Sequence, residues 1–271
     1  MWTAGGCVGT ITCAGYAELS CVKLILPWST ASMRFCTSEL KTSIICRALV
    51  QRFPGQTILS ATGIRRQESP NRAKAPVAKQ QPKLASASRR TQGLDWHPIL
   101  NWTTEQVFAY LEEKEIPLHE AYTRYGSSRV SCCFCILSSQ NDLAAAARSA
   151  ENQAVYRDLV GLEAESTFPF QATRWLADVA PHWLTGELRQ AVIVAKAGAR
   201  RREAAEAKIP QHLLYTDGWP RTVPTIAEAS LLCDVRREVA SAVGIEVGYT
   251  TPLEVIRRYE ELLSNGAGAA A

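Results

Sequence analysis

The order of the predicted secondary structure constrains this fold most strongly, because its pattern changes near residue 136. Before that point, strand-like runs alternate with helical periodicity: Thr57–Thr62 predicts a strand, whereas Ser38–Phe53 predicts a helix that begins at Ser38. Lys23–Leu26 predicts a further short strand, and Thr103 or Thr104 is expected to cap a helix that runs through Leu111. This alternation, followed by helices alone, predicts an α/β core with a helical C-terminal extension.

Helical periodicity dominates the chain after Gln140. The expected helices cover residues 141–148, 151–164, 172–179, 186–207, 225–242 and 252–263. Pro169, Pro181, Pro210, Pro220 and Pro252 mark the breaks between them. By contrast, the Pro-, Lys- and Ser-rich stretch that extends to about Gly93 predicts a long loop, of the kind that is functional or disordered.

Four segments follow from these patterns. Residues 1–22 are irregular and suggest a mis-started N-terminus, 23–140 form the α/β domain, 141–265 form the helical region, and 266–271 form a flexible tail. The formal charge of +4 gives no strong signal for nucleic-acid binding. No apolar run reaches the roughly 20 residues of a membrane span, so no membrane partner is expected. Nine cysteines without an export signal indicate a reducing compartment, and we expect a cytoplasmic protein.

A dense group of cysteines is the first candidate for chemistry. Cys132 and Cys135 form a C-x-x-C pair, a spacing that allows two thiolates to bind one metal centre, and Cys133 lies between them. Cys36 precedes a predicted helix, where the partial positive charge of the helix start stabilises a thiolate. The alternative for Cys36 and Cys133 is that they are small buried core residues. Cys46 and Cys233 lie on apolar helix faces and are predicted to be core residues.

An arginine-rich loop is the second candidate. Arg65, Arg66 and Arg72 follow the predicted strand Thr57–Thr62, and Ser69 adds a hydroxyl donor. Ligands of open α/β sheets bind outside the carboxyl ends of the strands, and arginine matches phosphate and sulfate oxygens in a bidentate manner. The loop therefore predicts an anion site, with a solvated surface loop as the alternative.

Several stretches of the chain resemble, in family order, the phosphoadenosine phosphosulfate (PAPS) reductase family within the PP-loop adenine nucleotide α-hydrolase superfamily. They are Arg34–Lys41, Thr62–Ser69, Asp95–Thr104, Pro117–Tyr122 and Gly126–Cys135, and the resemblance covers about residues 23–140. It implies a Rossmann-like α/β core that binds an adenylyl nucleotide, either ATP or PAPS. It also implies an oxidoreductase or sulfurtransferase role in sulfur metabolism, together with a redox or sulfur-donor partner protein.

The resemblance assigns roles to individual residues. Arg65, Arg66, Ser69 and Arg72 would contact the anionic end of the nucleotide. Cys36, Cys132 and Cys135 would hold a 4Fe–4S cluster, with Cys133 as a candidate fourth ligand. A structural zinc site is the alternative to the cluster.

Two family features are absent from the sequence. No S-x-G-x-D-S phosphate loop is present, so the chain resembles an N-terminally truncated member, and no C-terminal E-C-G cysteine is present. We therefore expect weak or no turnover by the chain alone. A rival interpretation is a non-enzymatic partner-binding or nucleic-acid-associated module, related to DNA sulfur modification and carrying a structural metal site. It would use six basic residues: Arg65, Arg66, Arg72, Lys74, Lys79 and Lys83.

Overall fold

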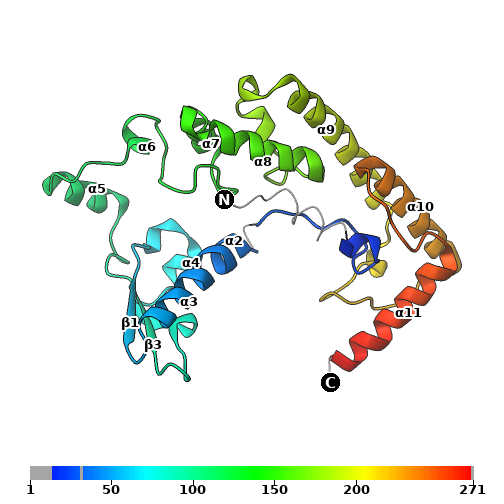
Figure 1. The fold of residues 1–271 in the computed structure, drawn as a ribbon, viewed down its shortest axis with the longest axis horizontal. Coiled ribbons are helices and arrows are strands. Elements are labelled where there is room, and N and C mark those ends of the chain that lie inside the picture. The colour runs from blue at the N-terminus through cyan, green and yellow to red at the C-terminus, as the bar shows by residue number, and fades with distance from the viewer. Residues whose placement is uncertain (1–13, 31–32, 270–271) are drawn as a thin grey trace. The chain divides into compact units, whose positions relative to one another are not determined.

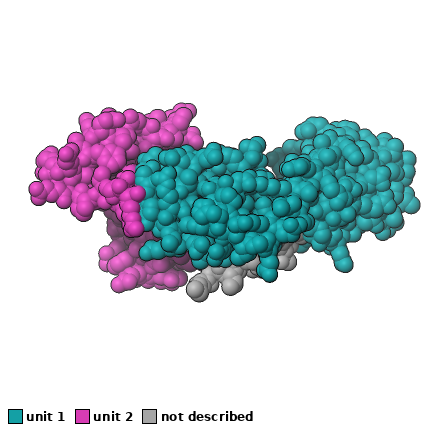
Figure 2. Space-filling view, turned by 90° about the horizontal axis from the view of Figure 1, so that it is seen from above, with its two compact units in different colours: residues 1–28, 125–271 teal, residues 29–124 magenta. Residues whose placement is uncertain are grey.

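The computed structural model describes residues 14–30 and 33–269, which divide into two compact units. The sheet unit is residues 29–124, and the helical unit is residues 1–28 together with 125–271 (Figure 2). Strands and helices are both present, which confirms the predicted α/β class. The boundaries of these units differ from those of the predicted domains 23–140 and 141–265. The predicted domain division stays a prediction. No helix in the described ranges is long and apolar enough to cross a membrane.

The sheet unit contains a three-stranded sheet with the order β1-β3-β2. Strand β1 (Thr57–Ala61) runs parallel to β3 (Gln92–Trp96), with Leu59 opposite Leu94, and β2 (Ala78–Gln80) is antiparallel to β3. A parallel pair needs a crossover connection, and residues 62–91 supply it. The expected long loop therefore contains a strand, β2, which the sequence analysis missed.

The sheet unit also contains helical segments (Figure 1). They are α2 (Phe35–Thr37), a π-helical segment (Ser38–Thr42), α3 (Ser43–Arg52), α4 (Pro70–Ala73), α5 (Thr104–Glu113) and α6 (Glu120–Thr123). The prediction of Ser38 as an N-cap is wrong, because the helical segment begins at Phe35 and the N–H of Cys36 donates to Ser29 Oγ (3.1 Å) instead. At α5 the predicted cap is confirmed: Thr103 and Gln106 form a reciprocal capping box.

The helical unit is built from five longer helices. They are α7 (Gln140–Ala146), α8 (Gln153–Ser166), α9 (Gly186–Glu206), α10 (Ile226–Val243) and α11 (Pro252–Ala269). Their shared core includes the fully buried residues Tyr156, Val239 and Tyr259. Tyr16 and Leu19 are also fully buried in this core, so the segment before the sheet unit contributes to the helical unit.

Two predicted elements of the helical unit are wrong for the same reason. Residues 172–179 form only a short 3₁₀ turn, Leu176–Asp178, and the N–H groups of Leu176 and Ala177 donate to the buried carboxylate of Glu163. Lys23–Leu26 forms no strand, and the N–H of Leu24 donates to Glu206 Oε1 (2.9 Å). In both places a distant carboxylate satisfies the backbone donors that a helix or ladder would have used.

The chain ends also differ from expectation where they are described. Residues 14–17 are helical rather than irregular, whereas residues 1–13 of the predicted irregular start lie outside the described residues. Helix α11 continues to Ala269, so most of the predicted flexible tail 266–271 is helical, and residues 270–271 lie outside the described residues.

Candidate functional site

The arginine loop, residues 62–74, leaves the carboxyl end of β1 as predicted. The neighbouring parallel strand β3 ends beside it, because Ala61 lies opposite Trp96 and the N–H of Thr62 donates to Trp96 O (2.9 Å). The loop thus lies where open parallel sheets bind their ligands. One short segment therefore contains all four predicted anion-binding residues, namely Arg65, Arg66, Ser69 and Arg72.

Hydrogen bonds to neighbouring groups fix the three arginines of this loop. Arg65 Nη1 donates to Thr104 Oγ1 (3.0 Å), and Arg66 Nε donates to Asn101 Oδ1 (2.8 Å). Arg72 Nη1 donates to Glu68 Oε2. Because a guanidinium has five N–H donors, each arginine keeps donors for a ligand after these bonds are made. The loop is therefore organised before any anion binds.

Glu68 is a site residue that the sequence analysis missed. Burial alone would raise its pKa, but hydrogen bonds from the Arg65 N–H and the Arg72 side chain lower the pKa of Glu68 below its usual value. Its carboxylate lies 3.6 Å from Arg65 Nη2. An incoming phosphate or sulfate would compete with Glu68 for these two arginines. Glu68 lies three residues after Arg65 and four residues before Arg72. This spacing, at which charged side chains of a helix can pair, was the sequence signal for these two ion pairs.

Ser69 has a structural role in the loop. Its hydroxyl accepts from the N–H of Arg72 (3.2 Å) and caps α4. The hydroxyl hydrogen can still be donated, since Ser69 Oγ acts as an acceptor in this cap. Ser69 therefore positions Arg72, and it retains a donor for an anion.

The cysteine turn, residues 131–138, belongs to the helical unit. Phe134 is buried in the core and its ring lies 5.6 Å from that of Tyr156. With Phe134 directed inward, Cys132 and Cys133 are exposed and Cys135 is half-buried. The interpretation of Cys133 as a buried core residue is therefore wrong, whereas Cys46 and Cys233 are buried as predicted.

Two polar residues fasten the base of this turn. Asp142 Oδ1 accepts from the N–H of Ser128 (2.7 Å), and Asp142 Oδ2 accepts from the hydroxyls of Ser128 (2.9 Å) and Ser139 (2.8 Å). Gln171 Nε2 donates to the carbonyls of Ile136 and Ser138, both at 2.8 Å. The sequence analysis did not identify Asp142 or Gln171, because both act on backbone and hydroxyl groups that only the fold brings near them.

Asp142 is stabilised as a carboxylate. Burial by itself would raise the pKa of Asp142, but the N–H of Ser128 and the hydroxyls of Ser139, Ser128 and Ser127 outweigh it and lower the pKa to about 2. A carboxylate that accepts several hydrogen bonds in its charged form has a depressed pKa for this reason. The base of the cysteine turn therefore stays charged across the physiological pH range.

The thiols have environments suited to metal binding. Cys135 Sγ accepts from the N–H of Leu137 (3.5 Å), and hydrogen bonds to ligand sulfurs are one way in which proteins tune metal–thiolate centres. In the sheet unit, a hydrogen bond with Ser29 outweighs burial, and Thr37 and Lys41 add to it, so that the pKa of Cys36 is lowered. A lower pKa favours the thiolate, which is the form that binds metals. The hydrogen bonds to the sulfurs of Cys36 and Cys135 therefore suit either cysteine to bind iron or zinc.

The four candidate cysteines belong to different units. Cys36 belongs to the sheet unit, whereas Cys132, Cys133 and Cys135 belong to the helical unit. Over residues 14–30 and 33–269, no group of three or more His, Cys, Asp or Glu residues forms a metal site. Among the candidate cysteines, Cys132 and Cys135 lie close together in one unit, at the C-x-x-C spacing.

Comparison with known proteins supplies the family. The family model of the phosphoadenosine phosphosulfate reductase domain matches residues 28–138. This segment is therefore similar to a PAPS reductase domain. The match includes both the arginine loop and the cysteine turn, and so it extends past the sheet unit into the helical unit.

One curated relative of the chain is an uncharacterised 37.8 kDa protein from the gpa 5′ region of Escherichia phage 186. It is 34% identical over 116 residues, which are 41% of this chain and 32% of the relative. The chain therefore spans about a third of the length of that relative. No solved structure matches the chain.

Proposed function

We propose that this PAPS reductase-type protein acts in cytoplasmic sulfur metabolism or sulfur transfer by binding an adenylyl nucleotide, ATP or PAPS, at the arginine loop. The observation that carries the proposal is the position of Arg65, Arg66 and Arg72 at the carboxyl ends of two parallel strands. The family match over the same residues supports it. A redox or sulfur-donor protein would be the partner.

The chemistry of the loop follows from its hydrogen bonds. The phosphate or sulfate end of the nucleotide would take the free N–H donors of Arg65 and Arg66, whose planar forks suit bidentate contacts. Thr104 and Asn101 hold these two side chains in place, so little side-chain entropy is lost on binding. Release of Arg72 from Glu68 would add a third positive group.

A metal centre at the cysteine turn is the second part of the proposal. Cys132 and Cys135 would hold a 4Fe–4S cluster, with Cys133 as a candidate further ligand. Such a cluster supplies electron transfer or an iron site for sulfur chemistry when it is bound. The protein contributes the exposed thiols, the N–H of Leu137 donated to Cys135, and the anchoring of the turn by Asp142.

Isothermal titration with PAPS and with ATP tests the nucleotide part. Arg66→Ala should weaken binding by about 10- to 100-fold, since a charge-assisted hydrogen bond contributes about 1.5–3 kcal/mol. Arg124→Ala is the matched control, because Arg124 is an exposed arginine of the same unit whose ion pair with Glu120 spans 3.7 Å. Equal affinity for wild type and Arg66→Ala would show that the nucleotide does not use this loop. Turnover of radiolabelled PAPS or ATP is expected to be weak or absent, and robust turnover would overturn that expectation.

Anaerobic purification tests the metal part. We expect a brown protein that contains iron and acid-labile sulfide, and we expect Cys135→Ser to lose both. Cys233→Ser, a substitution of a buried core cysteine, should retain them. A colourless protein that contains zinc would favour the structural zinc site over the cluster. A protein that contains neither metal would refute both hypotheses.

A further inference from the structure

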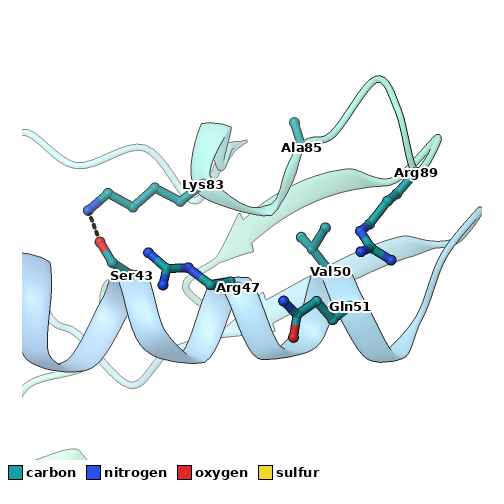
Figure 3. A pocket seen from close by; sticks show the side chains of 7 residues that line it. All are labelled: Ser43, Arg47, Val50, Gln51, Lys83, Ala85 and Arg89. Atoms are coloured by element: carbon teal, nitrogen blue, oxygen red, sulfur yellow. Dashed lines mark hydrogen bonds between the residues drawn. The ribbon is translucent and has the colours of Figure 1, made fainter.

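A basic pocket lies between α3 and the connection from β2 to β3, within the sheet unit (Figure 3). It has a volume of about 340 Å³ and is lined by Ser43, Arg47, Val50, Gln51, Lys83, Ala85 and Arg89. Arg47 extends from the helix and Arg89 from the opposite connection, so that both guanidinium groups point into the space between these elements. Three of the seven lining residues are cationic and none is acidic.

Two of the three cations have no partner to neutralise them. Arg47 and Arg89 form no ion pair and no side-chain hydrogen bond with any residue in the described part of the chain. Lys83, by contrast, is fixed: its Nζ donates to Ser43 Oγ (2.7 Å) and Ser38 O (3.2 Å), and it lies 3.8 Å from Glu39 Oε1. The pocket therefore combines one anchored cation with two that are available to a ligand.

The wall that carries Arg89 is held in place by its backbone. Ser86 and Thr91 exchange backbone hydrogen bonds (3.2 and 3.1 Å), and the carbonyl of Arg89 accepts from the N–H of Gly55 (2.8 Å). Arg90 adopts a left-handed conformation with φ of 53°, which closes the turn. Arg89 therefore lies in a tight, hydrogen-bonded turn that faces α3.

The charge and openness of the pocket define the ligand. An arginine fork binds phosphate oxygens in a bidentate manner, and two forks with a lysine favour more than one negative charge. The pocket is open, so a single phosphate would remain hydrated and its attraction screened. From Ser43 to Gln51 the α3 wall is about 12 Å long at 1.5 Å per residue. One strand of nucleic acid carries a charge about every 3.4 Å along its axis, so several consecutive phosphates fit this length.

We propose that the basic pocket binds a run of consecutive phosphate groups, from either a polyphosphate chain or a nucleic-acid backbone. Sequence charge supports this: residues 34–90 contain twelve Lys and Arg but two acidic residues. The pocket is separate from the arginine loop. Gly55 and Arg89 precede β1 and β3, whereas the arginine loop follows β1, so the two basic regions lie at opposite ends of these strands.

Fluorescence anisotropy with a labelled 12-nucleotide single-stranded DNA and calorimetry with tripolyphosphate test the proposal on the full chain. The double variant Arg47→Gln/Arg89→Gln should bind about tenfold more weakly than wild type. The slope of the logarithm of the DNA-binding constant against the logarithm of the salt concentration should become less steep by about 1.4, since two phosphate contacts are lost. Glutamine keeps both positions polar, and both side chains are exposed, so circular dichroism should show an unchanged fold.

Two comparisons make the outcome decisive. Arg124→Ala should leave this binding unchanged, and Arg66→Ala shows how much of it the arginine loop contributes. If Arg66→Ala removes the binding and the double variant does not, the phosphates bind at the arginine loop and the proposal is wrong. Binding of the oligonucleotide alone identifies a nucleic-acid backbone as the ligand, and binding of tripolyphosphate alone identifies a small polyphosphate. Absence of binding by both probes overturns the proposal.

Discussion

The helical unit and the sheet unit differ in how much of their apolar surface they bury. Tyr16, Tyr156 and Tyr259 of the helical unit are fully buried, and their hydroxyls or rings contact other core residues. In the sheet unit, Leu59 is 55% exposed and Trp96 42% exposed, although both lie on strands. Stability thus resides mainly in the helical unit. The sheet unit presents its cations and the arginine loop at the surface, where a ligand can reach them.

The largest expected effect tests the core of the helical unit. Tyr259→Ala removes a fully buried ring that lies 5.4 Å from the ring of Tyr215 and whose hydroxyl donates to Leu213 O (3.0 Å). We expect a loss of about 4 kcal/mol in the free energy of unfolding, measured by urea denaturation. Leu59→Ala in the sheet unit is the control and should cost less than about 1 kcal/mol. Equal losses would abolish the distinction between the two units.

The second prediction concerns a buried charge. Arg236 is fully buried and donates to the carbonyls of Tyr16 (2.9 Å), Ala17 (2.9 Å) and Gly248 (2.7 Å). Arg236→Met keeps the aliphatic bulk but removes all three of these hydrogen bonds, and should cost about 3 kcal/mol. Hydrogen exchange should localise the loosening to residues 14–22 and 244–250.

The adjacent Arg237 is the matched control for this prediction. It is exposed and forms a surface ion pair with Asp234 (2.6 Å). Arg237→Met should change the free energy of unfolding by less than about 1 kcal/mol. If both substitutions cost the same, the three carbonyl contacts of Arg236 do not stabilise the packing of the N-terminal segment.

The third prediction concerns Gly93 on β3, where the sheet unit is tightly packed. A Cβ added at Gly93 on β3 would lie 2.2 Å from Leu84 Cβ and 2.7 Å from the backbone oxygen of Gln81. Gly93→Ala should therefore cost between about 2 and 3 kcal/mol, measured by thermal unfolding. Gly161→Ala in α8, where the added Cβ would meet open space, should instead stabilise by about 0.5–1 kcal/mol. A tolerated Gly93→Ala would mean that β3 does not pack closely on Leu84.

Local sequence signals account for the features that were predicted correctly. The capping box of Thr103 and Gln106, strand β1 and helices α7 to α11 depend on residues within a few positions of one another. The position of the arginine loop followed from the same logic, because it comes directly after a strand. Hydrophobic periodicity and capping residues are patterns within one or two helical turns of sequence, and these patterns are sufficient to predict such features.

Long-range contacts explain what the sequence did not reveal. Glu206 accepts from the N–H of Leu24, 182 residues away, and so replaces a predicted strand by an irregular segment. Arg47 and Arg89 are 42 positions apart and line one pocket only because α3 and the β2–β3 connection face each other. No spacing rule links such residues.

Asp142 gives the smallest expected effect and lies at the base of the cysteine turn, where a metal centre is proposed. Its pKa in the folded protein, about 2, lies below the ordinary aspartate value of 3.8. The carboxylate is thus stabilising above about pH 4, and this contribution of about 2 kcal/mol is lost as the pH falls through 2. Asp142→Asn should lower the free energy of unfolding at pH 7 by a similar amount and flatten its pH dependence between pH 4 and 2.

The exposed carboxylate of Asp217 provides the control for that measurement. Asp217→Asn affects an aspartate that is 90% exposed and 3.7 Å from Arg221, so the pH dependence should remain as in wild type. Because Asp142 also holds Ser128 and Ser139 at the base of the cysteine turn, Asp142→Asn should lower the metal content of the purified protein as well. A normal metal content in that variant would show that the cysteine turn keeps its shape through Phe134 and Gln171 alone.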